Sequence, residues 1–93
     1  MKLRLTHRAE ADLARIADYL YARNPSAALR VEADLKAALR LISSYPEIGR
    51  RHRRDVRRFA VPRCPYLIFY GIGSALDEIN IFTIRHAARR EEH

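Results

Sequence analysis

The sequence is short of several residue types, and each shortage excludes a class of protein. Its 93 residues include one cysteine, Cys64, which excludes an internal disulfide and fits a reducing compartment. No apolar run approaches the length that crosses a membrane, and the first eight residues lack the apolar segment of a signal peptide. We therefore expect a cytoplasmic protein with no membrane partner, in one domain that covers residues 1–93.

Lysine is also scarce, because Lys2 and Lys36 are the only two, and yet the net charge is +7. Arginine therefore provides the positive charge, and its planar guanidinium suits bidentate contacts to phosphate or carboxylate. The pI of about 10.3 raises the expectation of a polyanionic partner, either nucleic acid or an acidic protein. A solvated basic surface, or a genome that favours arginine codons, would explain the same composition.

Patterns for metal binding and nucleophilic catalysis are missing as well. The four histidines are scattered, with no carboxylate or cysteine at ligand spacing, so the sequence predicts neither a metal site nor a cofactor. Cys64 follows Arg63, a neighbour that lowers the pKa of a thiol, but the sequence places no base beside it. His86, at the end of a predicted strand, is either a hydrogen-bonded structural residue or a proton carrier.

Two amphipathic helices are predicted in the first half of the chain. The first runs from His7 to Arg23, with Thr6 as its N-cap. Asn24-Pro25 then supplies the N-cap and the first residue of a second helix that ends near Ser44, so the pair forms a helical hairpin. The apolar stripes are Leu13, Ile16, Ala17 and Leu20 in the first helix, and Ala28, Val31, Leu35, Ala38, Leu39 and Ile42 in the second.

Four strands are predicted around these helices. Leu3 to Thr6 is a short strand, and Val56 to Val61 is a second one with Arg57 and Phe59 on one face. Tyr66 to His86 then reads as an antiparallel hairpin, because two segments rich in β-branched and aromatic residues flank a Gly- and Asp-bearing connector. The predicted fold is α+β, a two-layer β-α-α-β-β-β domain with the helical hairpin packed on one face of a mainly antiparallel sheet.

The hairpin from Tyr66 to His86 is apolar on both faces. A strand with one wet face alternates apolar and polar residues, so both faces of this hairpin need a cover. The helices cover one face, which leaves the other as a predicted docking surface. The alternative is that sheet curvature and the C-terminal tail cover it.

Five motifs, in this order and spacing, resemble the ParE toxins of the RelE/ParE superfamily. Each motif is weak alone, but together they span nearly the whole chain. The motifs are Asn24-Pro25-x-Ala27-Ala28-x-Arg30, Tyr45-Pro46-x-x-Gly49-Arg50, Val56-Arg57-Arg58, Pro65-Tyr66-Leu67-Ile68-Phe69-Tyr70 and Ile84-Arg85-His86-x-x-Arg89.

The resemblance implies the toxin of a bacterial type II toxin–antitoxin pair. Its partner would be a cognate antitoxin, an acidic protein whose C-terminal segment wraps the toxin and whose N-terminal part binds DNA. ParE proteins are described as poisoning DNA gyrase, whereas RelE relatives cut messenger RNA on the ribosome. The resemblance therefore leaves two targets, which the residues have to separate.

Cutting RNA without a metal requires a general base, a general acid and cations for the phosphate. Arg85 and Arg89 suit the phosphate and His86 suits proton transfer, but the terminal tyrosine common in the ribonucleases is missing, since no tyrosine follows Tyr70. We therefore predict a non-catalytic inhibitor of DNA gyrase, with a RelE-like ribosome-dependent endoribonuclease as the alternative.

The residues predicted to contact the target lie near the end of the last strand: Arg57, Arg58, Arg85, His86, Arg89 and Arg90. Those predicted to bind the antitoxin are apolar: Leu13, Ile16, Leu20, Tyr66, Ile68, Tyr70, Phe82 and Ile84. Direct binding of nucleic acid is left open. The arginine-rich run from Arg50 to Arg58, predicted as a loop leading into a strand, fits nucleic acid, the target, an acidic antitoxin segment or solvent alone.

Overall fold

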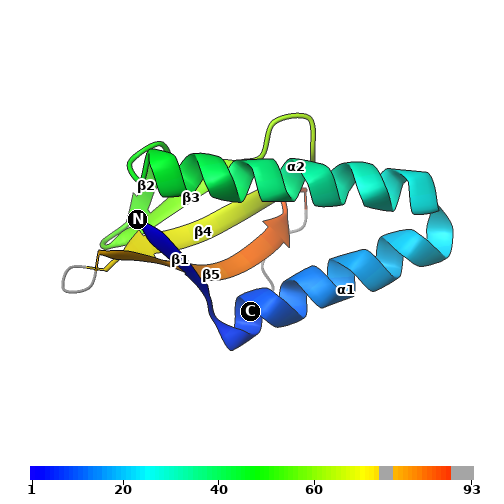
Figure 1. The fold of residues 1–93 in the computed structure, drawn as a ribbon, viewed down its shortest axis with the longest axis horizontal. Coiled ribbons are helices and arrows are strands. Elements are labelled where there is room, and N and C mark those ends of the chain that lie inside the picture. The colour runs from blue at the N-terminus through cyan, green and yellow to red at the C-terminus, as the bar shows by residue number, and fades with distance from the viewer. Residues whose placement is uncertain (74–76, 89–93) are drawn as a thin grey trace.

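A computed structural model of the chain describes residues 1–73 and 77–88. The elements in chain order are β1 (Lys2–Leu5), α1 (His7–Arg23), α2 (Pro25–Ser44), β2 (Arg50–Arg53), β3 (Val56–Ala60), β4 (Tyr66–Ile72) and β5 (Glu78–His86). Figure 1 shows the two helices as a hairpin that lies across one face of the sheet. The predicted α+β fold, with one helical layer and one sheet layer, is confirmed.

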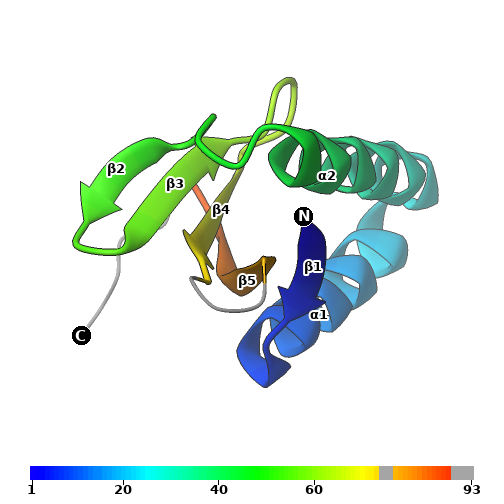
Figure 2. The same cartoon turned by 60° about the vertical axis from the view of Figure 1, so that its left-hand side comes forward.

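The sheet has five strands in the order β1-β5-β4-β3-β2. β1 pairs parallel with β5, and the three remaining pairs are antiparallel, so the prediction of a mainly antiparallel sheet is also confirmed. In Figure 2 both helices lie to one side, and β2 ends the sheet furthest from α1. The first strand of the chain therefore lies beside the last one.

The strand β2 corrects the prediction of a loop in this part of the chain. Arg50 pairs with Arg58 and Arg51 with Arg57, and Asp55 takes a left-handed conformation with φ of 62° in the turn that follows. All four residues of β2 are exposed, so no apolar alternation marks the strand in the sequence. Charged side chains on an exposed edge strand also discourage pairing with another chain.

The predicted caps of both helices are confirmed. The Thr6 hydroxyl accepts a hydrogen bond from the Ala9 N–H at 3.1 Å, and the Asn24 side chain accepts one from the Ala27 N–H at 3.1 Å. Pro25 occupies the first turn of α2, where its missing N–H has no intrahelical partner to lose. Within the described residues, neither helix is long and apolar enough to cross a membrane.

The core lies between the helices and the inner face of the sheet. Ile68, Tyr70, Ile79 and Ile81 are fully buried, and Ile42 from α2 packs with them. Each such side chain contributes roughly 1.5–3 kcal/mol relative to full exposure. The alternating residues of β4 and β5 that face the helices thus provide the main hydrophobic stabilisation.

A β-bulge interrupts the alternation of side chains along β5. Phe69 pairs with Thr83 but Tyr70 pairs with Ile81, so Phe82 is the extra residue between the two pairs. The extra residue shifts the alternation, so that Ile84 is buried at 2% exposure while Phe82 is 36% exposed. Strict alternation from Glu78 to His86 predicts that Phe82 and Ile84 share a face, and the bulge shows this prediction to be wrong.

Candidate functional site

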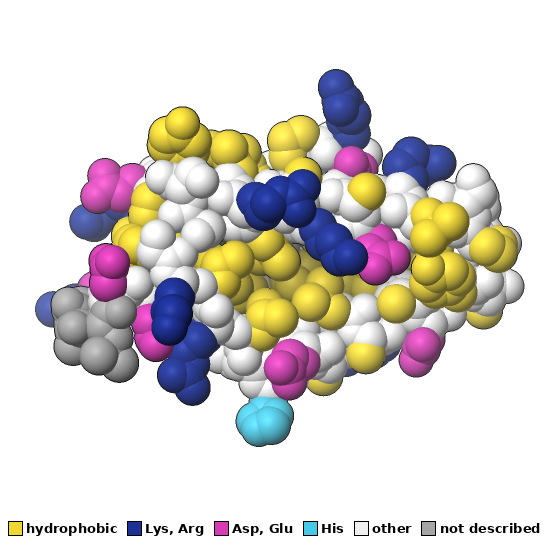
Figure 3. All heavy atoms as spheres, in the orientation of Figure 1, with side chains coloured by type: hydrophobic (Ala, Val, Ile, Leu, Met, Phe, Trp, Pro, Cys, Tyr) yellow, Lys and Arg dark blue, Asp and Glu magenta, His cyan; other side chains and the backbone are white. Residues whose placement is uncertain are grey.

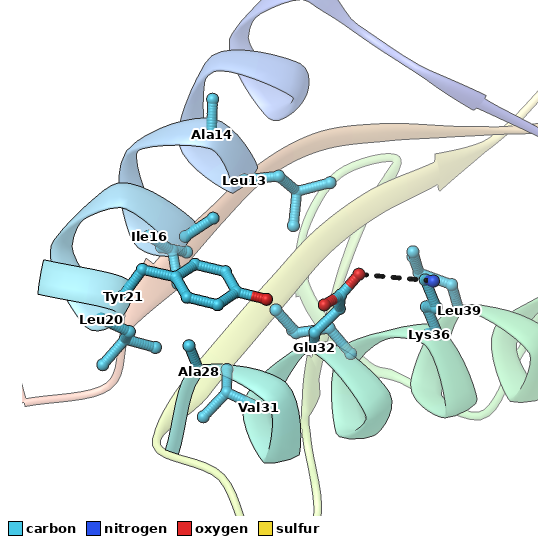
Figure 4. Close-up of a pocket in the computed structure, with 12 residues that line it drawn as sticks. Leu13, Ala14, Ile16, Leu20, Tyr21, Ala28, Val31, Glu32, Lys36 and Leu39 are labelled. Carbon is cyan, nitrogen blue, oxygen red and sulfur yellow. Dashed lines mark ion pairs between the residues drawn. The ribbon is translucent and has the colours of Figure 1, made fainter. Parts of the chain in front are cut away.

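A groove between α1 and α2 is the first candidate surface. Figure 3 shows apolar side chains gathered in a hollow between the two helices. The hollow has a volume of about 390 Å³, and Figure 4 shows Leu13 and Ile16 of α1 facing side chains of α2. Its aliphatic lining comes from the two predicted stripes and includes Leu13, Ile16, Leu20, Val31, Leu35 and Leu39.

The groove exists because the stripe of α1 is not fully covered. In α1 only Ala9 and Asp12 are buried, whereas Leu13, Ile16 and Leu20 are half-buried. The prediction that both stripes bury against the sheet thus holds for much of α2 and only in part for α1. Leu13 and Ile16 still pack against the core, but Leu20 is not among the side chains that do so.

Four other residues predicted to bind the antitoxin lie in the core. The exposed fraction is 7% for Tyr66, 0% for Ile68 and Tyr70, and 2% for Ile84. Their side chains face the helices, which fill the space that a partner would need. Burial therefore removes these four from the docking surface, while Phe82 lies on the other face of the sheet.

A depression on that other face, here called the outer-face cleft, is the second candidate surface. It has a volume of about 450 Å³, and its apolar lining comes from Val56, Leu67, Phe69 and Phe82. The remaining lining includes two imidazoles and two guanidiniums, from His52, Arg53, Arg85 and His86. The sequence predicted an uncovered face because the hairpin is apolar on both sides. The arginines in the lining add affinity for anionic groups.

His52 is the cleft residue that the sequence did not predict. It belongs to β2, and its ring meets the Phe69 ring edge-on at a centroid distance of 5.1 Å. The Arg85 guanidinium lies 5.8 Å from the centroid of the same Phe69 ring. The Phe69 ring therefore contacts both the His52 imidazole and the Arg85 guanidinium on the outer face of the sheet. If β2 had been predicted as a strand, the alternation of side chains along it would have placed His52 on the outer face.

His86 closes the end of β5 beside the cleft. Its ring meets Tyr66 edge-on at 5.3 Å, and its Nδ1 atom accepts a hydrogen bond from the Ala88 N–H at 3.1 Å. Since Nδ1 accepts, the proton of the neutral ring is on Nε2. His86 thus presents a donor at its other nitrogen.

Arg57 does not join the other predicted target-binding residues. It lies on the inner side of β3 and donates hydrogen bonds to the carbonyls of Gly49 at 2.8 Å and Glu47 at 3.2 Å. The Tyr70 hydroxyl donates to the Pro46 carbonyl at 2.7 Å and accepts from the Gly49 N–H at 2.9 Å. Burial raises the pKa of Tyr70, so the phenol keeps the proton that it donates. Arg57 and Tyr70 together fix the segment from Pro46 to Gly49.

The other predicted target-binding residues are placed as follows. Arg58 pairs with Phe69 and so shares the outer face, although it does not line the cleft. Arg85 and His86 both line the cleft. Arg89 and Arg90 lie outside the described residues.

Cys64 and the potential metal ligands are the other reactive groups of the described residues. Burial raises the pKa of the Cys64 thiol, which disfavours the nucleophilic thiolate. In residues 1–73 and 77–88, no three His, Cys, Asp or Glu side chains converge as metal ligands would.

Comparisons with known proteins place the chain in a family. The model of the ParE toxin of the type II toxin–antitoxin system parDE matches residues 3–91. Toxin RelE2 of Caulobacter vibrioides is 42% identical over 84 residues, which are 90% of this chain and 92% of that protein. Putative toxin Y4kP of Sinorhizobium fredii is 33% identical over 87 residues, which are 92% of this chain and 88% of that protein.

Solved structures agree with the fold. The chain is similar to a chain of the chromosomal ParDE TA system from P. aeruginosa, with a TM-score of 0.79, 24% identity and coverage of 92% and 95% of the two chains. It is also similar to the isolated E. coli RelE toxin, with a TM-score of 0.66, 16% identity and coverage of 97% and 87%. The family match covers nearly the whole sequence, so the chain belongs to the ParE toxin family of type II toxin–antitoxin systems.

Proposed function

We propose that this chain is a toxin that a cognate antitoxin neutralises by laying an amphipathic segment in the groove between α1 and α2. The observation that supports this most directly is the groove itself, a hollow of about 390 Å³ between the two helices with a mainly aliphatic lining. Similar folds include the RelBE2 toxin–antitoxin complex of Mycobacterium tuberculosis and the intact E. coli RelBE complex. An apolar helix face in an apolar groove is a recurrent mode of peptide recognition.

Leu20 offers the sharpest test of this groove. It lines the groove without packing against the core, so Leu20→Glu should leave the fold intact. We expect antitoxin affinity to fall by about 100-fold, because a charge replaces a buried apolar anchor. The measurement is calorimetric titration with the product of the neighbouring antitoxin gene.

Leu29→Glu is the matched control, because Leu29 is also an aliphatic helix residue but is 59% exposed and does not line the groove. Its affinity should stay within about twofold of the unmodified chain. If Leu20→Glu binds as tightly as the control, the antitoxin does not occupy this groove.

DNA gyrase is the target that we propose, and the outer-face cleft is the surface that contacts it. Membership of the ParE family supports the target, and the exposed Phe82 between cationic side chains supports the surface. The described residues that line the cleft include no carboxylate to act as a partner for either imidazole. A rigid sheet with an adhesive, cationic face suits an inhibitor that binds and does not react.

Arg85→Ala tests this surface in a supercoiling assay with purified gyrase. We expect the concentration for half-inhibition to rise by about tenfold or more, because Arg85 lines the cleft and supplies its charge. Arg30→Ala, on an exposed position of α2, should inhibit like the unmodified chain. If supercoiling is untouched by a large molar excess of folded chain, gyrase is not the target.

One observation favours a second candidate, an endoribonuclease. His52 and His86 line the same cleft as Arg53 and Arg85, and two imidazoles with two guanidiniums are groups that metal-free RNA cleavage uses. An endoribonuclease should produce new messenger RNA ends after induction of the chain. These new ends should be absent after induction of His52→Ala or His86→Ala. Primer extension that finds no new ends while cells filament would exclude it.

A further inference from the structure

The edge of β5 changes its partner halfway along the strand. β1 accompanies it only as far as the pair Leu5 and Ile81. The Thr6 N–H then donates to the Ile81 carbonyl at 3.1 Å, and the Thr6 hydroxyl donates to the Phe82 carbonyl at 3.0 Å. Beyond Phe82 no strand flanks this side of β5 in the described ranges, so its backbone groups need another partner.

Asp12 of α1 supplies that partner. Its Oδ2 atom accepts a hydrogen bond from the Thr83 hydroxyl at 2.5 Å and another from the Ile84 N–H at 3.0 Å. Its Oδ1 atom accepts from the Arg15 guanidinium, and Arg8 Nε lies 4.0 Å from Oδ2. The Asp12 residue is only 2% exposed, so these contacts replace water around a buried carboxylate.

The position of this contact along β5 matters more than its strength. Ile84 follows the bulge at Phe82 and directly precedes Arg85 and His86, which line the outer-face cleft. A bulge loosens the local ladder and leaves the following side chains dependent on other constraints for their direction. Asp12 fixes the backbone at that point from the edge, while β4 holds the other side through the pair Ile68 and Ile84.

We propose that Asp12 is a positioning residue, which orients Arg85 and His86 at the cleft by holding Thr83 and Ile84; this rests on the proposed role of the cleft as the target-contacting surface. Asp12 does not line the cleft, but Thr83, whose hydroxyl donates to Asp12, is one of the lining residues. Asp12 acts from the helical layer, through the strand, on Arg85 of the opposite face and on His86 at the end of β5.

The test compares Asp12→Ala and Thr83→Val with a core variant of matched melting temperature, Ile42→Val or, for a larger loss, Ile42→Ala. Ile42 is fully buried in the last turn of α2 and does not line the cleft. The first readout is amide hydrogen exchange of the purified full chain. We expect exchange at Ile84 and Arg85 to accelerate by about tenfold or more in Asp12→Ala and to stay within about twofold in the core variant.

The second readout is toxicity, measured as the induction level that halves growth. Asp12→Ala and Thr83→Val should need about tenfold more induction, whereas the core variant should be as toxic as the unmodified chain. Thr83→Ser keeps the hydroxyl and should restore both toxicity and protection of the Ile84 amide. A purely stabilising role would instead make toxicity follow melting temperature in every variant.

Unchanged exchange at Ile84 in Asp12→Ala overturns the inference, and so does equal loss of toxicity in the core variant. Faster exchange with full toxicity overturns it as well, and Arg85→Ala then identifies the cause. If Arg85→Ala loses its toxicity, the end of β5 is needed for toxicity but does not depend on Asp12 for its orientation. If Arg85→Ala is still toxic, the cleft is not the toxic surface and the proposed function is at fault.

Discussion

At the scale of single residues, Asp12 gives the clearest dependence on pH. Burial alone raises the pKa of this carboxyl, but the hydrogen bonds from Thr83 and Ile84 and the adjacent Arg15 outweigh burial and hold its pKa below the ordinary 3.8. A carboxyl with a lowered pKa in the folded state stabilises that state fully above its unfolded pKa. The stabilisation is lost as the pH falls from about 4 through the folded pKa.

Asp12→Asn should therefore be less stable than the unmodified chain at neutral pH by about 1–3 kcal/mol, because the amide offers no charge to Arg15 or Arg8. The gap in the free energy of unfolding should narrow as the pH falls from about 5 to about 2. Urea unfolding at several pH values measures it. A gap that stays constant over this range would show that Asp12 does not titrate as inferred.

The sequence could not predict Asp12, and the reason is physical. A charged residue next to an apolar stripe is normally solvated, and the stripe of α1 begins one residue later at Leu13. Only the end of β1 at Leu5 leaves a strand edge for Asp12 to cap. Thr6 and Asn24 were predictable because an N-cap depends on local sequence alone.

At the scale of elements, the alternating strands and the helix boundaries were predicted well, and the exceptions share one cause. β2 has no apolar alternation because both of its faces are exposed, and β5 breaks its alternation at the bulge. Pairing with a neighbour defines both features, and a single strand's sequence does not record that pairing. The sequence predicted that one face of the sheet is uncovered, but it did not predict that His52 lies on that face.

The segment between α2 and β2 depends on a buried phenol. Tyr70→Phe removes the donor to the Pro46 carbonyl and the acceptor for the Gly49 N–H, and leaves both groups without this partner. We expect a loss of about 1–3 kcal/mol in the free energy of unfolding, measured with urea. Tyr45→Phe is the control, because Tyr45 is 62% exposed, and its effect should be within about 0.5 kcal/mol. Equal effects would mean that the phenol does not anchor the segment.

At the scale of the whole molecule, the net charge of +7 bears on association. An acidic antitoxin segment should associate quickly at low salt, and the association rate should fall steeply between about 0.05 M and 0.5 M NaCl. The dissociation rate should change much less, because the groove that holds the segment is mainly apolar. Stopped-flow mixing measures both rates. An association rate that is indifferent to salt would contradict steering by charge.

The parallel pairing of β1 with β5 also has a consequence for synthesis. Residues Lys2 to Leu5 pair with Glu78 to Ile81, so β1 cannot join the sheet until β5 has been made. A chain emerging from the ribosome can form its helical hairpin early, because those contacts are local. β5 is made after the other four strands, and a product that stops before Glu78 lacks the strand that joins β1 to the other three. The complete sheet therefore cannot form until β5 has been made, and a chain that terminates before β5 cannot assemble either Asp12's contacts or the cleft.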